Sequence, residues 1–159
     1  MRIARVVGGV LGILAAAALV GWLLRTDPLG PLAGRALTGP EAPYPSDWSF
    51  SDAAYTVAVE TRPSAPHSVT TIAFVHEGNL YIPAREGSQK RWTQYAIDDP
   101  NVRIKIDGTV YSARLVRVEI DDPRPYVDSA ARKYAQMASA LEAGELPEDL
   151  WLFRVEPRS

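Results

Sequence analysis

The sequence lacks cysteine altogether and has only two histidines among its 159 residues. Without cysteine the chain can form no disulfide framework, no thiol nucleophile and no cysteine-ligated zinc site, and it has no cysteine for lipid attachment. A metal site built on His67 and His76 would need a third, acidic ligand, so we predict no metal site and expect both histidines at the surface. No nucleophile elbow accompanies His67, which argues against a serine hydrolase.

Basic charge is scarce beyond the N-terminus. Three of the 17 basic residues lie in the first 25 positions and none of the 19 acidic residues does, so residues 26–159 carry a net charge of about −5. A negative surface repels phosphate backbones and anionic lipid headgroups. We therefore predict no nucleic-acid partner.

The N-terminus carries the one long uncharged run of the chain, the nineteen residues from Val6 to Leu24. A helix of that length covers about 28 Å, close to the hydrocarbon thickness of a bilayer. Because Arg2 and Arg5 precede the run, the positive-inside bias places the rest of the chain outside the cytoplasm. The sequence thus predicts a signal-anchor transmembrane helix over residues 1–25, spanning the cytoplasmic (inner) membrane once through residues 6–24. The C-terminal domain would be extracytoplasmic, in the periplasm.

A cleaved signal peptide is the alternative reading of the same segment, because its basic start and apolar run look alike. Its apolar region is usually about 7–15 residues long and ends at a site of small residues. Here the run ends in bulky residues that include Trp22, which favours the uncleaved anchor. Residues 26–45, rich in proline and glycine, are predicted as a semi-extended tether. Residues 46–159 have the usual size of a single domain.

Hydrophobic periodicity predicts about six strands and two helices in that domain. The strands are expected at residues 55–61, 68–76, 80–82, 102–106, 109–119 and 150–155, and the helices at residues 88–98 and 127–144. The pair Asp107-Gly108 is typical of a two-residue hairpin turn. Mostly antiparallel strands with a helix between hairpins indicate a mostly β (α+β) split β-barrel, because closure removes exposed sheet edges.

Four stretches, in this order, resemble the flavin-binding split β-barrel superfamily, which includes pyridoxamine-phosphate-oxidase-like and deazaflavin-dependent nitroreductase-like proteins. They are Ser68–Thr71, Gly78–Ile82, Trp92–Ile104 with its Asp-Pro-Asn-Val sequence, and Phe153–Arg158. The resemblance extends from Tyr55 to Arg158. It implies FMN or a deazaflavin as the cofactor, and a homodimer whose two chains both line the cofactor groove.

The resemblance also implies a set of cofactor-binding residues, because in this superfamily the cofactor phosphate lies against the second and third strands and the start of the next helix. A helix N-terminus offers unpaired N–H groups to an anion. The implied residues are Thr70 and Thr71 as hydroxyl donors, Arg85, Lys90 and Arg91 as cations, Gly87 and Ser88 as the close backbone, and Trp92 beside the ring. In the alternative interpretation, the three cations form a solvated helix end and Trp92 belongs to the core.

Two functions remain open on the sequence. The first is a membrane-anchored, exported oxidoreductase that uses a flavin or deazaflavin, with catalytic residues unknown. The second is a non-catalytic exported domain that binds a ligand or a partner on the same fold, with no cofactor. The second gains weight from the loop at residues 62–67, where two prolines remove N–H donors. It gains further weight from the location, because reduced nicotinamide and reduced deazaflavin are not expected outside the cytoplasm.

Overall fold

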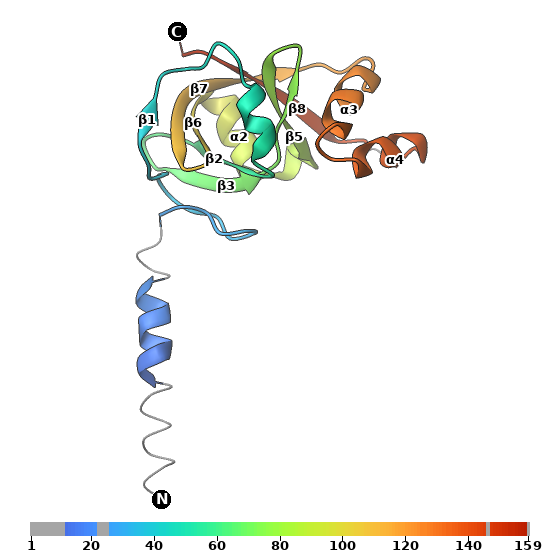
Figure 1. Cartoon of the computed structure of the whole chain (residues 1–159). Helices are drawn as coiled ribbons and strands as arrows, with labels where there is room; N and C mark the ends of the chain where they lie inside the picture. The colour runs from blue at the N-terminus through green and yellow to red at the C-terminus, as the bar shows by residue number, and fades with distance from the viewer. Residues whose placement is uncertain (1–11, 22–25, 146, 159) are drawn as a thin grey trace, which may run out of the picture.

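The computed structural model describes residues 12–21, 26–145 and 147–158. Residues 12–21 form a helix whose side chains are exposed (Figure 1). In this described part of the chain, no helix combines the length and the apolar character that crossing a bilayer requires. The two ends of the predicted anchor, at residues 6–11 and 22–24, lie outside the described residues, so the anchor stays a prediction.

The domain that follows is mostly β, as the sequence predicts, although the described residues form more strands than expected. The strands are β1 Glu41–Ala42, β2 Val57–Thr61, β3 His67–Thr71, β4 Phe74–His76, β5 Asn79–Arg85, β6 Asn101–Ile106, β7 Thr109–Val118 and β8 Leu150–Glu156. The helices are α2 Arg91–Asp98, α3 Arg124–Ala131 and α4 Gln136–Glu142, with 3-10 turns η1 at Ser49–Ala53 and η2 at Gly87–Gln89.

The strands form one sheet in the order β3-β2-β6-β7-β8-β5-β4, with antiparallel neighbours, and β1 pairs in parallel with β7. The two strands at the ends of this order, β3 and β4, are consecutive in the chain and are joined by only Ile72 and Ala73. The sheet therefore curls round on itself, as Figure 1 shows. This geometry is that of a split barrel, in which one segment contributes to both ends of the sheet.

The single strand predicted over residues 68–76 is wrong, because it is two strands with a break between them. β3 pairs with β2, whereas β4 pairs with β5. At the break, the carbonyl oxygen of buried Ala73 accepts hydrogen bonds from Lys133 Nζ (2.9 Å) and Tyr134 Oη (3.2 Å). Side chains replace the ladder at this point, so the backbone can turn without leaving a buried acceptor unpaired.

The predicted hairpin between β6 and β7 is confirmed. Asp107 and Gly108 both have left-handed backbones, with φ of 45° and 83°, as a two-residue turn of this twist requires. The register pairs Ile106 with Thr109. The alternation of the strand follows the prediction, because Val102, Ile104 and Ile106 are buried in the core.

The second predicted helix, over residues 127–144, is also divided in the structure. α3 ends at Ala131 and α4 begins at Gln136. Between them Tyr134 is only 1% exposed, and its hydroxyl donates to the carbonyl oxygen of Tyr55 at 2.6 Å. The break places Tyr134 in a small core that includes Ala130 of α3 and is separate from the main barrel core, and Met137 of α4 packs against the same small core.

The segment predicted as a tether, residues 26–45, packs against the barrel rather than extending away from it. Leu37 is 3% exposed, and its N–H donates to Glu60 Oε2 at 2.6 Å. Arg103 Nη1 donates to the same oxygen at 2.9 Å and to the carbonyl oxygen of Leu37. The N–H and the carbonyl group of Leu37 thus both have hydrogen-bond partners on the barrel. Glu60 is the buried acceptor that holds this segment.

Replacing Glu60 with Gln removes a charge that is only 5% exposed and leaves the Arg103 guanidinium without its buried anionic partner. We expect the free energy of unfolding, measured by urea denaturation, to fall by about 2–3 kcal/mol. The control is Glu41→Gln, which removes the other carboxylate bound to Arg103, at a side chain that is 66% exposed. It should cost less than about 1 kcal/mol. Equal small effects would show that Glu60 does not hold the segment.

The start of β3 packs against α2 through His67, which is half-buried rather than at the surface as expected. Its ring lies edge-on to Tyr95, with 5.6 Å between ring centroids, and the Arg62 guanidinium lies over the Tyr95 ring. Burial, with the charges of Arg62 and Arg91, lowers the pKa of His67 below its usual value. Protonation of His67 therefore opposes folding.

This lowered pKa predicts acid sensitivity. The unfolded chain binds a proton at His67 more readily than the folded chain does. The free energy of unfolding is therefore at its full value above the unfolded-state pKa of 6.5, and it decreases as pH falls below that value. We expect His67→Asn to reduce the difference in unfolding free energy between about pH 7.5 and pH 5. The measurement is denaturation of both proteins at each pH. An unchanged difference would contradict this assignment.

Candidate functional site

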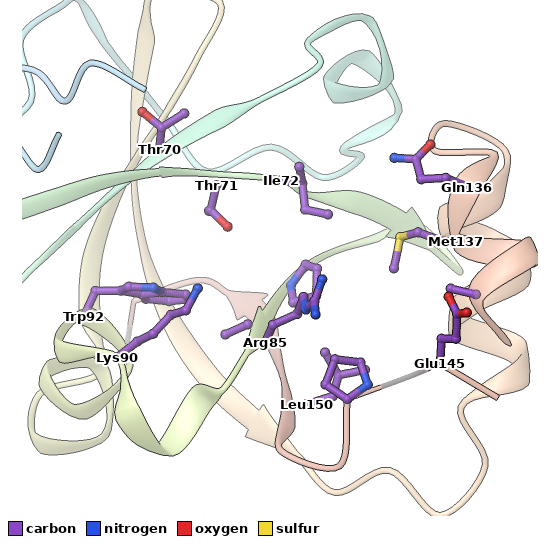
Figure 2. Close-up of a pocket in the computed structure, with 14 residues that line it drawn as sticks. Thr70, Thr71, Ile72, Arg85, Lys90, Trp92, Gln136, Met137, Glu145 and Leu150 are labelled. Carbon is purple, nitrogen blue, oxygen red and sulfur yellow. The ribbon is translucent and has the colours of Figure 1, made fainter. Parts of the chain in front are cut away.

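A cavity of about 430 Å³ opens where β3 ends, between β5, the start of α2 and helix α4 (Figure 2). It lies at the break after β3, where the chain passes from β3, which pairs with β2, to β4, which pairs with β5. Helix α4 lines its far side. It is lined by Thr70, Thr71, Ile72, Pro83, Ala84, Arg85, Lys90, Trp92, Gln136, Met137, Ala140, Glu145, Pro147 and Leu150.

Five of the eight residues predicted to bind the cofactor line this cavity. They are Thr70, Thr71, Arg85, Lys90 and Trp92. Figure 2 shows Thr70, Thr71 and Ile72 on one side of the cavity, with the side chains of Lys90 and Trp92 beside each other at one end. Residues from three separate elements thus meet at one opening.

Trp92 belongs to the core and also lines the cavity. It is 5% exposed and belongs to the main core, where its ring centroid is 5.6 Å from that of Phe153. It also contributes to the lining of the cavity. Trp92 can therefore support the barrel on one side and offer an apolar surface to a ligand on the other.

The other three predicted residues, Gly87, Ser88 and Arg91, do not line the cavity. Ser88 donates both its N–H (2.9 Å) and its hydroxyl (2.6 Å) to Asp149 Oδ2. The hydrogen bond from the Ser88 hydroxyl lowers the pKa of Asp149. The Asp149 carboxylate thus accepts the hydrogen bonds of the two Ser88 groups that the resemblance assigns to a phosphate.

Gly87 has a packing role at the same turn. Its N–H donates to the carbonyl oxygen of Asp149 at 3.1 Å, and a Cβ at this position would come within 2.2 Å of Trp151 Cγ. Only glycine allows this close approach of η2 to β8. Arg91 is exposed and lies near His67, as its effect on the His67 pKa indicates.

The sequence interpretation missed the far wall of the cavity, which α4 and the chain after it supply. Gln136, Met137 and Glu145 line the cavity, and none of the three is among the predicted site residues. Figure 2 shows Met137 and Glu145 at the end of the cavity opposite Lys90 and Trp92. The division of the predicted helix into α3 and α4 is what brings these residues to the opening.

The lining combines hydrogen-bond donors with apolar side chains. The Arg85 and Lys90 cations and the Thr70 and Thr71 hydroxyls are suited to an anion, because all four groups donate hydrogen bonds. Trp92 and Leu150 are suited to a flat apolar group. The cavity can therefore hold a molecule with a planar ring and an anionic substituent. Across the described ranges of the chain, no group of three or more His, Cys, Asp or Glu residues comes together to hold a metal ion.

Comparison with known proteins gives structural likeness without sequence likeness. No protein-family model and no curated protein matches the chain. A protein of unknown function from Agrobacterium tumefaciens C58 matches with a TM-score of 0.53 and 16% identity, over 67% of this chain and 49% of that one. The chain thus spans about half the length of that protein.

Two further structures match over most of their own length. The heme storage protein HutZ from Vibrio cholerae has a TM-score of 0.51 and 14% identity, over 69% of this chain and 86% of that one. An F420-H2-dependent reductase, FDR-A, has a TM-score of 0.51 and 13% identity, over 76% of this chain and 100% of that one. Likeness at this level of identity establishes the fold alone. The chain has the split β-barrel fold of the pyridoxamine-phosphate-oxidase-like and F420-dependent reductase proteins, which the sequence resemblance indicated.

Proposed function

We propose that the cavity binds a phosphate-bearing flavin or deazaflavin, and that the protein is a membrane-anchored, extracytoplasmic oxidoreductase. The observation that carries this proposal is the cavity itself, whose lining combines two cations and two hydroxyls with the apolar surface of Trp92. Its volume of about 430 Å³ falls within the usual range of ligand pockets, about 300–1,000 Å³. The fold supports the same ligand class, because one similar structure is an F420-H2-dependent reductase.

The residues of this chain suggest how the ligand would be held. Arg85 and Lys90 would bind the phosphate, with Thr70 and Thr71 as further donors, and Trp92 would contact the ring. The Ser88 turn would take no part while Asp149 occupies its donors. A bound flavin or deazaflavin would supply the electron or hydride transfer, which none of the protein side chains can perform.

The membrane location rests on the uncharged N-terminal run. The described part of that run is helical and exposes large apolar side chains, with Ile13 71% and Leu14 60% exposed. Within the described residues these side chains lack a protein surface to cover them, and lipid would do so. We propose that residues 6–24 span the cytoplasmic membrane, and that two copies of the chain associate as a homodimer.

A non-catalytic, exported ligand-binding domain is the second candidate. The contact between Ser88 and Asp149 favours it, because this contact removes two donors from the turn that the resemblance assigns to the phosphate. The two candidates differ in the behaviour of the bound ligand. An oxidoreductase reduces or reoxidises it with a quinone or another electron carrier, whereas a binding domain leaves its redox state unchanged.

The binding proposal predicts different effects for two adjacent cations. Lys90 lines the cavity and Arg91 does not, although both are exposed and carry the same charge. We expect Lys90→Ala to weaken binding of riboflavin phosphate by about tenfold, since a hydrogen bond to a charged group contributes about 1.5–3 kcal/mol. Arg91→Ala should change the affinity by less than about twofold. The measurement is quenching of flavin fluorescence on titration with protein.

Riboflavin without phosphate, and a deazaflavin, complete the experiment. Riboflavin should bind the unaltered protein more weakly than its phosphate, and Lys90→Ala should reduce that difference, because Arg85 remains in the lining. Equal losses from Lys90→Ala and Arg91→Ala would indicate nonspecific charge attraction. Failure of the protein to retain or quench any of the three compounds would rule out both the cofactor and the oxidoreductase.

A further inference from the structure

A small apolar turn projects from the segment that joins helix 12–21 to the barrel. Leu29 and Leu32 exchange backbone hydrogen bonds, both of 3.0 Å, around Gly30 and Pro31. The side chains of Leu29 and Leu32 are 64% and 48% exposed. We call residues 28–34 the leucine turn; all seven are uncharged. Figure 1 shows it beneath β1 and β3, standing out from the body of the barrel.

The leucine turn is fixed to the barrel at its base. Gly34 exchanges two backbone hydrogen bonds with Ser68 of β3, at 2.8 and 3.2 Å. Asp27, just before the turn, binds Lys105 of β6 at 2.6 Å. The Arg35 N–H donates to the carbonyl oxygen of Thr26 at 2.6 Å and closes the base. These contacts at the base hold the turn in place against the barrel while the side chains of Leu29 and Leu32 stay exposed. Two apolar side chains held in solvent in this way suggest a surface that meets a partner.

The neighbouring chain indicates what the leucines meet. Leu29 follows Leu24, the end of the uncharged run, by five residues, a reach of at most about 18 Å. This distance keeps the turn close to the headgroup region of a membrane that the run would span. The Asp27 charge is neutralised by Lys105, so it does not oppose approach to anionic lipid. Arg35 is exposed at the other end of the turn, where a lipid phosphate could bind it.

We propose that the leucine turn inserts Leu29 and Leu32 into the interfacial layer of the membrane and so holds the barrel at the bilayer surface. This inference rests on the proposed anchor at residues 6–24, and adds a second contact to it. The contact would fix the orientation of the barrel, which a single helix followed by a flexible tether would leave free. The barrel would then lie directly at the bilayer surface, whereas the predicted tether would separate it from the membrane.

The absence of cysteine allows a direct test with the full chain. Single variants Leu29→Cys and Leu32→Cys would each be labelled with an environment-sensitive fluorophore and reconstituted into phosphatidylcholine–phosphatidylglycerol vesicles. The control is Ile97→Cys on α2, whose side chain is 48% exposed, the same fraction as Leu32. We expect blue-shifted emission and quenching by brominated lipid at positions 29 and 32, and neither effect at position 97.

Flotation of the same vesicles after an alkaline wash tests the anchor separately. A chain that does not float with the vesicles would contradict the anchor, and with it this inference. A chain that floats while the label at position 29 emits as it does in water would contradict the inference and leave the anchor intact. Blue-shifted emission that brominated lipid does not quench would show that protein, such as a second copy, covers the turn, and would also overturn the proposal.

Discussion

The break at Ile72 and Ala73 is the constraint on which the rest of the structure depends. It moves the chain from one end of the sheet to the other, so that β3 and β4 lie at opposite ends of a single curled sheet. The Ala73 carbonyl is satisfied there by Lys133 and Tyr134 instead of by a neighbouring strand. Burial lowers the pKa of Lys133, whose ammonium also donates to the Ser51 carbonyl oxygen at 2.8 Å. The buried polar contacts at the break thus let the sheet split without an unpaired backbone acceptor.

The same break creates the cavity. β3 and β5 do not pair with each other, and the space between them is bounded by α2 on one side and α4 on the other. The cations and hydroxyls that line it come from β3, from β5 and from the start of α2. The turn at Gly87 and Ser88 does not line this space, because Ser88 is hydrogen-bonded to Asp149 and Gly87 packs against Trp151. The cavity therefore lies in the general location that the superfamily resemblance implies for a cofactor, and side-chain donors line it in place of the backbone turn.

The sequence predicts those parts of the fold whose signals are local. The Asp107-Gly108 hairpin is one such part, and the alternation around Ile104 is another. The break at Ile72 has no local signal, because residues 68–76 are a continuous run of residues suited to a strand. The contact between Ser88 and Asp149 joins positions 61 residues apart, and that between Leu37 and Glu60 joins positions 23 apart. The sequence does not show that Asp149 accepts the hydrogen bonds of Ser88, or that Glu60 accepts the hydrogen bond of the Leu37 N–H. Both contacts form only when the chain folds.

We propose that the cations of the cavity at the break receive the phosphate of a flavin-like ligand. A crystal structure of the protein with riboflavin phosphate would show this directly. We expect phosphate density within hydrogen-bond distance of Lys90 and Arg85, the ring beside Trp92, and the hydrogen bonds between Ser88 and Asp149 intact. Phosphate bound at Ser88 with Asp149 displaced, or a ligand bound away from the cavity, would contradict it.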